Sequence, residues 1–173
     1  MPETVDSINE LNKDLFKSEE TDPFCDPIQA RKKAMNYLAR REYGHFELQD
    51  KLKNVGFGTE TVKITVDLLA YEGLQCDRRF IKSFIQSRIN QGKGPVRIRL
   101  DLNERKLEDS LIDELLSECN EDWMTMAKQI REKKFGPELP VEFKEKARQM
   151  RFLQYRGFEL GQIQAAIMPH GED

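Results

Sequence analysis

Apolar residues recur along this chain in a pattern that appears three times. Each copy is centred on an apolar anchor, and the anchors Phe57, Leu107 and Phe158 lie about 50 residues apart. An apolar residue stands five positions before each anchor, and others stand five and nine positions after it. These flanking residues are Leu52, Val62 and Val66 in the first copy, Leu102, Ile112 and Leu116 in the second, and Leu153, Ile163 and Ile167 in the third. Four columns in register indicate a chain of tandem repeats.

Within each copy the spacing of apolar residues is typical of amphipathic helices. In the second copy, for example, one helical face collects Phe80, Ile81, Phe84, Ile85 and Ile89. Asp77 precedes this stripe, so we expect its carboxylate to cap the first turn. Arg88 falls inside the apolar arc, which indicates a role in packing. The turn at 92–95, Gly-Lys-Gly-Pro, ends this helix and begins another element.

Two segments alternate between apolar and polar residues and, taken alone, favour strands. They are 96–102 in the second copy and 62–66 in the first. We predict helices for both, because the corresponding segments of the other copies have helical spacing. We also expect the first helix to span 28–41, Thr59 to cap the third helix of the first copy, and Asn120 to cap the first helix of the third copy.

The pattern therefore predicts an all-α fold of tandem three-helix repeats, stacked into an elongated, curved array. Three short helices bury little surface alone, so neighbouring copies must share interfaces. We expect an acidic N-terminal extension at 1–27, followed by three-helix repeats at 28–74, 75–119 and 120–168. A curved helical array is suited to lying along an extended partner.

Charge is distributed unevenly along the sequence. The whole chain has a formal net charge of −3, yet its first 29 residues contain eight acidic residues and two lysines. The remainder is therefore basic. The acidic arm is either a solvated extension or a segment that folds back on the basic body and competes with an anionic ligand.

Basic residues are least diluted by acids in the second copy. From Arg78 to Arg99 the chain has seven Lys or Arg residues, and no acidic residue occurs before Asp101. The natural partners of such a run are phosphates or an acidic protein groove. Arginines are spread over all three copies, which favours contact with a nucleic-acid backbone or a protein over readout of bases. The candidate binding residues in this run are Arg78, Arg79, Lys82, Lys93, Arg97 and Arg99.

Enzymatic chemistry is not indicated by any motif. The histidines are His45 and His170, and neither has an identifiable acid–base partner in the sequence. The three cysteines are odd in number and lack metal-ligand spacing, so we expect reduced thiols and neither a metal nor a cofactor. The chain has no apolar run long enough to span a membrane and no secretory signal pattern. We expect a cytoplasmic, monomeric protein that is not an enzyme.

Several ordered blocks between about Ala30 and Met168 match a known family. The central blocks are Asp77-Arg78-Arg79-Phe80 and Gly92-Lys93-Gly94-Pro95, the latter followed by Arg97, Ile98 and Leu102. The earlier blocks are Leu38-Ala39-Arg40-Arg41-Glu42 and a group of Glu47, Leu48, Leu52, Gly56 and Phe57. The later blocks are Lys134-Phe135-Gly136 and a group of Arg151, Phe152, Leu153, Arg156, Gly157 and Phe158. In these blocks the sequence resembles the RecX family, small bacterial regulators of the RecA recombinase.

This resemblance implies tandem three-helix repeats and a regulatory function. RecX-like proteins bind RecA filaments on single-stranded DNA, lie along the helical groove, and inhibit filament extension, ATP hydrolysis, strand exchange and the co-protease activity of the SOS response. The six candidate residues of the second copy would then face the filament, with single-stranded DNA as a further possible contact. The alternatives are a sequence-nonspecific DNA-binding protein that acts without RecA, and a helical adaptor with another protein partner. The acidic arm lies outside the resemblance.

Overall fold

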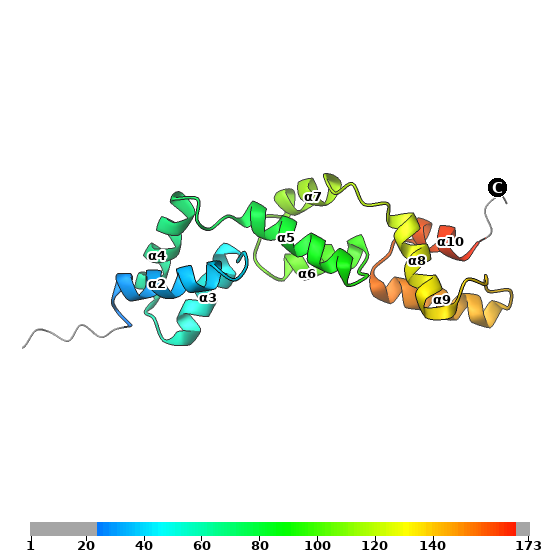
Figure 1. The fold of residues 1–173 in the computed structure, drawn as a ribbon, viewed down its shortest axis with the longest axis horizontal. Coiled ribbons are helices and arrows are strands. Elements are labelled where there is room, and N and C mark those ends of the chain that lie inside the picture. Colours follow the sequence, from blue (N-terminus) through cyan, green and yellow to red (C-terminus); the bar gives the residue numbers. More distant parts are fainter. Residues whose placement is uncertain (1–23, 169–173) are drawn as a thin grey trace, which may run out of the picture.

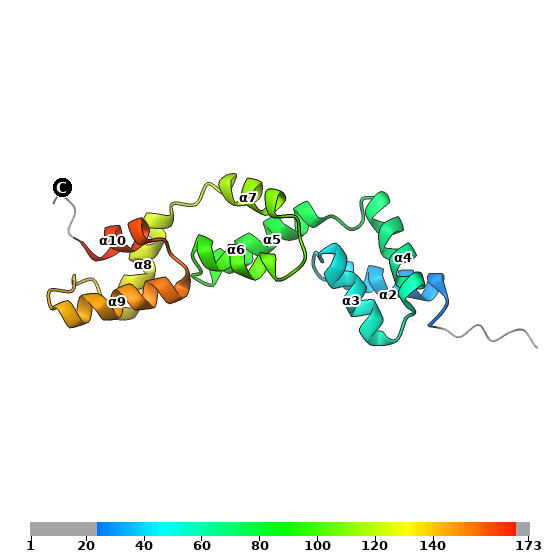
Figure 2. The same cartoon turned by 180° about the vertical axis from the view of Figure 1, so that it is seen from behind.

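The computed structural model describes residues 24–168, and within that range the chain forms nine helices and no strand. Figures 1 and 2 show three helical units in a row along the long axis of the molecule. Unit 1 consists of α2 (Pro27–Leu38), α3 (His45–Val55) and α4 (Thr59–Tyr71). Unit 2 consists of α5 (Asp77–Asn90), α6 (Pro95–Asn103) and α7 (Asp109–Ser117). Unit 3 consists of α8 (Trp123–Phe135), α9 (Phe143–Arg156) and α10 (Leu160–Ile167).

The prediction of an all-α array of three-helix units is confirmed, and both alternating segments are helical. Val62 and Val66 are buried one turn apart on α4, and Ile98 and Leu102 are buried one turn apart on α6. On a strand Ile64 and Leu100 would share the face of these buried residues, whereas both are about half exposed, as helical periodicity places them. The precise limits of each unit stay a prediction, and most of the acidic arm lies outside the described residues.

Each unit has its own apolar core, and the three anchors are buried in these cores. Phe57 belongs to the core of unit 1, Leu107 to that of unit 2 and Phe158 to that of unit 3. One column of the repeat is imperfect, because Leu115 is buried in unit 2 while Leu116 is only partly buried. Partly buried Ile89 and Trp123 pack against the cores of both unit 2 and unit 3. Apolar contact therefore continues from one unit to the next.

Three helix caps differ from the sequence predictions. Cys76 is the N-cap of α5, since the carboxylate of Asp77 accepts hydrogen bonds from outside its own helix. Gly58 caps α4, so Thr59 is its first helical residue. Asp122 caps α8 in place of Asn120, and its side chain accepts from the backbone N–H of Thr125 at 3.0 Å.

The first helix is also shorter than predicted, because α2 ends at Leu38. The backbone N–H of Arg40 turns back to the carbonyl of Tyr37 at 3.0 Å. This tight turn allows Tyr43 to reach the core of unit 1, where it is buried. Arg41 then lies over the Tyr43 ring, 3.6 Å from its centroid.

Arg131 illustrates that a basic residue of this chain can be structural. It is fully buried in unit 3, where its Nη1 donates to the carbonyl of Glu138 at 2.8 Å and its Nη2 to that of Pro137 at 3.2 Å. These bonds hold the linker between α8 and α9 against the unit. Arg131 is therefore unavailable to a partner.

Candidate functional site

Units 2 and 3 are joined through backbone atoms of the Gly-Lys-Gly-Pro turn. The N–H of Gly94 donates to the carbonyl of Arg156 at 2.8 Å, and the N–H of Val96 donates to the carbonyl of Gly157 at 3.0 Å. Both donors belong to the start of α6, whose first-turn amides have no partner inside the helix. The turn therefore docks one unit on the next, and its amides at Gly94 and Val96 are already occupied.

Units 1 and 2 are joined through the carboxylate of Asp77. Its Oδ1 accepts from the backbone N–H of His45 at 2.7 Å and from Nε2 of Gln75 at 2.9 Å. The same Gln75 amide, which is buried, also donates to the carbonyl of Tyr43 at 3.1 Å. Asp77 thus satisfies an orphan amide at the start of α3, a helix of the preceding unit.

The two joints are built on the same plan. Gly44 and Gly94 are the N-caps of the second helix in units 1 and 2, and each lies against the following unit. A β-carbon at Gly44 would lie 3.3 Å from the ring of Phe80. Each second helix therefore begins at the interface with the next unit, as a stacked array requires.

A left-handed corner completes the plan in each unit. The residue before each anchor has positive φ: 117° at Gly56, 56° at Lys106 and 89° at Gly157. Lys106 extends back to unit 1, with its Nζ 5.7 Å from the ring centroid of Phe46. In unit 1 the ring of Phe24 lies over this corner, 5.6 Å from that of Phe57. Phe24 therefore covers the left-handed corner of unit 1.

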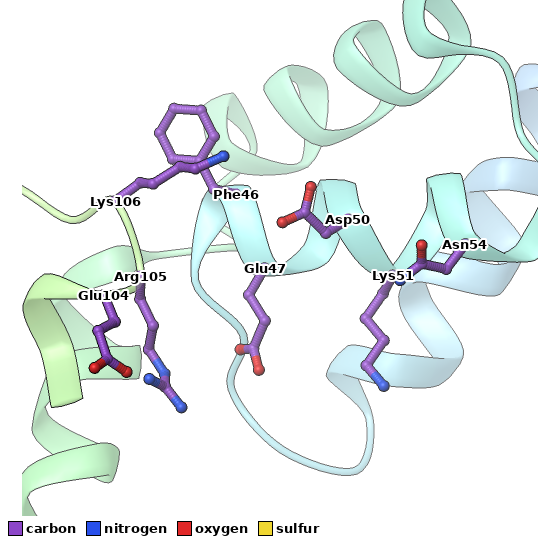
Figure 3. A pocket seen from close by; sticks show the side chains of 8 residues that line it. All are labelled: Phe46, Glu47, Asp50, Lys51, Asn54, Glu104, Arg105 and Lys106. Atoms are coloured by element: carbon purple, nitrogen blue, oxygen red, sulfur yellow. The ribbon is translucent and has the colours of Figure 1, made fainter.

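The joint between units 1 and 2 leaves a cleft of about 250 Å³ with mixed charge. Figure 3 shows Lys106 beside the Phe46 ring and Arg105 on the wall formed by the end of α6. The lining residues are Phe46, Glu47, Asp50, Lys51, Asn54, Glu104, Arg105 and Lys106. Three acidic and three basic side chains offset one another here, so the cleft does not favour an anion over a cation.

The basic run of unit 2 gains acidic partners from other parts of the fold. Nη2 of Arg78 lies 2.6 Å from Oε1 of Glu114 and 3.1 Å from Oε1 of Glu118 on the α7 side. Lys82 reaches the other oxygen of Glu118 at 3.3 Å. Hydrogen bonds from Arg78 and then Lys82 lower the pKa of Glu118 below its ordinary value. These two cations of α5 are therefore paired in the folded protein.

Arg79 lies on a different side of α5, at the joint with unit 1. Its Nε lies 2.9 Å from Oε1 of Glu42, and this hydrogen bond raises the pKa of Arg79. Its Nη1 and Nη2 donate to the carbonyls of Gly73 and Leu74, each at 3.0 Å. Arg79 therefore fastens the linker between the two units.

The remaining candidates lie at the end of α5 and along α6. Arg97 shares Asp101 with Arg88, at 2.9 Å and 3.2 Å, and the Arg88 guanidinium packs over Phe84 as its place in the apolar arc indicates. Arg99 pairs with Asp113 of α7. Lys93 forms no ion pair with any residue in 24–168, and its Nζ lies 6.0 Å from the Tyr155 ring centroid.

The six candidates are thus not gathered into one patch. Arg78 and Lys82 lie together beside α7, Arg79 lies at the first joint, and Lys93 lies at the second joint. The basic run from Arg78 to Arg99 contains no acidic residue, yet most of its positive charges are paired with carboxylates in the folded protein. These carboxylates belong to α6, to α7 and to the segment before α3. This surface therefore offers paired charges of both signs.

Sequence reasoning missed a second basic site, at the joint between units 2 and 3. A cleft of about 410 Å³ is lined there by Asn90, Gln91, Gly92, Ile130, Lys133, Lys134, Phe152 and Arg156. None of these side chains is acidic. Lys133 and Lys134 lie in the last turn of α8, where cations are common because they interact favourably with the helix dipole. The sequence has no signal that places them beside the turn of unit 2.

The described part of the chain also contains no metal-binding cluster, no free histidine and no membrane-spanning helix. Within residues 24–168 no group of His, Cys, Asp and Glu side chains has the arrangement needed to hold a metal ion. His45 is engaged by Gln49 and Asp67, each 3.1 Å from its Nε2. Over the same range, every helix is too short or too polar to cross a membrane.

Comparison with protein families decides the classification of this chain. Models of the first, second and third three-helix domains of RecX match residues 30–69, 77–116 and 120–167. The chain belongs to the RecX family. It is 42% identical over 147 residues to the Regulatory protein RecX of Pseudomonas savastanoi pv. phaseolicola, covering 85% of this chain and 95% of that protein. It is 41% identical over 143 residues to that of Halorhodospira halophila, covering 83% and 89%.

Solved RecX structures have the same fold. The crystal structure of RecX from Lactobacillus salivarius has a TM-score of 0.69 at 19% identity and covers 82% of this chain and 94% of its own. A second crystal structure of regulatory protein RecX has a TM-score of 0.70 at 23% identity and covers 82% and 72%. In this RecX chain the blocks that carry the family resemblance fall largely at the joints, at Asp77, Gly94 and Gly157.

Proposed function

We propose that this RecX protein is a negative regulator of the RecA recombinase. It binds RecA filaments on single-stranded DNA and inhibits their extension, ATP hydrolysis, strand exchange and co-protease activity. The proposal is supported by the family membership, which spans all three units, and by relatives named Regulatory protein RecX. It acts as a monomer in the cytoplasm and needs no cofactor.

The arrangement of the three units is the observation that carries this proposal most directly. Joints of one design connect the units, so the array presents an extended surface (Figure 1). A filament is an extended, repeating partner, and a row of joined units can contact several of its subunits at once. Contacts made in series add in free energy when the linked units fit the spacing of the partner.

The proposed filament-facing surface extends along unit 2 and its two joints, and its separate contact points are Arg78, Arg79, Lys82, Lys93, Arg97 and Arg99. Its pairs are solvent-exposed for the most part, and such pairs contribute only about 0–1 kcal/mol each. Exchanging an internal carboxylate for one on the recombinase therefore costs little. Because the surface has both signs of charge, it suits a protein face of mixed charge better than a bare phosphate backbone.

Inhibition follows from differential binding. A regulator that binds a capped or distorted filament more tightly than the active filament shifts the population away from the active form. No catalytic group is needed for this mechanism. The size of the effect is set by the ratio of the two affinities.

The test is ATP hydrolysis by the cognate RecA on single-stranded DNA, titrated with this protein. Hydrolysis should fall, and a variant with Arg78, Arg79, Arg97 and Arg99 changed to alanine should lose the effect while keeping its helical circular dichroism. Unchanged hydrolysis with the natural protein would overturn the proposal. Full inhibition by the four-alanine variant would overturn the assignment of the surface.

The alternative function, DNA binding without a recombinase, predicts a different result. Hydrolysis would then fall only at protein concentrations that already coat the DNA in the absence of RecA. Parallel binding curves with the same DNA separate the two functions. The acid-free cleft between units 2 and 3 is the observation that keeps this alternative relevant.

A further inference from the structure

The cleft between units 2 and 3 gathers cations from two helices around an open space. Lys133 and Lys134 are exposed on the last turn of α8, and Arg156 comes from the end of α9. Opposite them lies the α5–α6 turn, which contributes the amide side chains of Asn90 and Gln91. Five of the eight residues that line the cleft of about 410 Å³ therefore have side chains that can donate hydrogen bonds, and the other three are Gly92, Ile130 and Phe152.

These cations differ from those of unit 2 because no carboxylate occupies them. Within residues 24–168 neither Lys133 nor Lys134 forms an ion pair, and Arg156 donates to the backbone carbonyl of Gln91 at 3.0 Å. The nearest acid in sequence, Glu132, has an oxygen 3.5 Å from Nη2 of the buried Arg131. A phosphate entering the cleft would thus meet positive charge without displacing a carboxylate.

Aromatic rings accompany the cations. The ring of Phe152 lies beneath two of them, with Nζ of Lys134 and the guanidinium carbon of Arg156 each 5.3 Å from its centroid. Tyr155, one turn further along α9, is 78% exposed and has Lys93 beside it. An exposed ring next to a cationic groove is the arrangement that accepts a base of a single strand while the groove holds its backbone.

We propose that this cleft binds a single-stranded nucleic acid directly, with Lys133, Lys134 and Arg156 on the phosphates and Tyr155 stacked on a base. An acidic peptide would use the same cations, but it has no planar group to place on the exposed Tyr155 ring. The binding needs no recombinase. This direct binding goes beyond the proposed regulation of RecA, because the protein would contact the single strand of a filament as well as the recombinase.

The experiment measures fluorescence anisotropy of a fluorescein-labelled oligo(dT) with the full-length protein and no recombinase, over a series of salt concentrations. The variant Lys133→Ala/Lys134→Ala should bind about 25-fold more weakly near 0.1 M salt, since each phosphate contact on a single strand contributes a salt slope of about 0.7. The slope of log K against log salt should shrink by about 1.4. Arg156 is left intact because it also bonds Gln91 across the joint.

A matched control removes the same charge elsewhere. Lys53 and Lys63 are exposed in unit 1, and Lys53→Ala/Lys63→Ala should bind oligo(dT) as the natural protein does. Equal affinity and slope for the Lys133/Lys134 variant and this control would overturn the site. That result would not change the outcome expected in the ATP hydrolysis assay with RecA, so the nucleic-acid site and the proposed regulation of RecA are tested independently.

The aromatic part of the proposal has its own variants. Tyr155→Ala should weaken binding about tenfold without changing the salt slope, whereas Tyr155→Phe should bind like the natural protein because it keeps the ring. Unchanged affinity for Tyr155→Ala would overturn the stacking contact. Displacement of oligo(dT) by polyglutamate at equal charge would show that the cleft takes an acidic peptide and would overturn the nucleic-acid assignment.

Discussion

Gly94 and Gly157 meet backbone to backbone across the joint between units 2 and 3. A β-carbon on Gly94 would lie closer than 3.0 Å to the carbonyl group of Gly157, and one on Gly157 would lie equally close to the backbone of Arg97. No side chain can move aside to relieve the first clash, since the obstructing atoms are main-chain atoms. The two glycines are 63 residues apart, in two blocks that both resemble RecX, and the fold explains why both must lack a side chain.

Gly94→Ala should therefore open this joint. We expect a loss of about 1–3 kcal/mol in the free energy of unfolding, the range for forcing extra atoms into a packed site. Chemical denaturation followed by circular dichroism measures the loss. Gly161→Ala is the matched control. Gly161 lies in α10, and a β-carbon added there would meet nothing within 4 Å. A Gly94→Ala protein as stable as this control would contradict the close approach.

Lys106 occupies a backbone conformation that suits glycine. Its φ is 56°, while the corresponding residues of units 1 and 3 are Gly56 and Gly157. Because a left-handed conformation costs a residue with a side chain about 1 kcal/mol, Lys106→Gly should stabilise the protein by up to about that amount. Urea unfolding of this variant beside Lys106→Ala, which keeps the strain, gives the comparison. A less stable glycine variant would mean that the Lys106 contact with Phe46 outweighs the backbone strain.

Phe24 should stabilise unit 1 although it precedes the first helix. It covers the corner at Gly56 and meets Phe57 edge-on, and its carbonyl accepts from the N–H of Gly58 at 3.2 Å. We expect Phe24→Ala to lower the free energy of unfolding by about 1–2 kcal/mol, mainly through lost apolar and ring contact. Hydrogen exchange should show faster opening of α3 and α4 than of α8 to α10. Ile28→Ala, at a position that is 74% exposed, should change neither.

The carboxylate of Glu118 should contribute to stability only above its folded-state pKa. Hydrogen bonds from Arg78 and Lys82 lower that pKa below the ordinary glutamate value of 4.5, so the stabilisation is complete above 4.5 and is lost as pH falls through the folded value. Glu118→Gln should remove this part of the decline in stability at acid pH. Thermal unfolding at pH values from neutral to about 3 compares the two proteins. Parallel curves for the variant and the natural protein would contradict a pairing of Glu118 in solution.

The helices could be read from the sequence because their signal is local and repeated. The columns at Leu52, Leu102 and Leu153 lie in register, and that register settled the helical assignment of segments that alternate like strands. Capping was less predictable, since Asp77 was free to bond either to its own helix or to His45 of the preceding unit. The packing of unit 1 against unit 2 decides which backbone N–H donates to the Asp77 carboxylate.

The candidate site was less predictable than the fold for a related reason. Arg78 and Glu114 are 36 residues apart, and Arg79 and Glu42 are 37 apart, so no local pattern announces that they meet. The cleft of Lys133, Lys134 and Arg156 likewise forms only when unit 3 docks on the turn of unit 2. Charge counted along the chain therefore overstates the free positive charge of unit 2 and understates that of the second joint.

The paired state of Arg78 and Lys82 makes a specific prediction about the proposed regulation of RecA. If these cations bind the filament, they must first exchange Glu114 and Glu118 for carboxylates of the recombinase. Glu114→Gln/Glu118→Gln removes that competition, and since exposed ion pairs are weak, the variant should inhibit ATP hydrolysis at concentrations only about two- to tenfold lower. Glu60→Gln/Glu108→Gln, which changes the same net charge away from Arg78, serves as the control for non-specific attraction. Weaker inhibition by the Glu114/Glu118 variant would mean that the acids themselves contact the filament, because their loss would then remove binding energy and not competition.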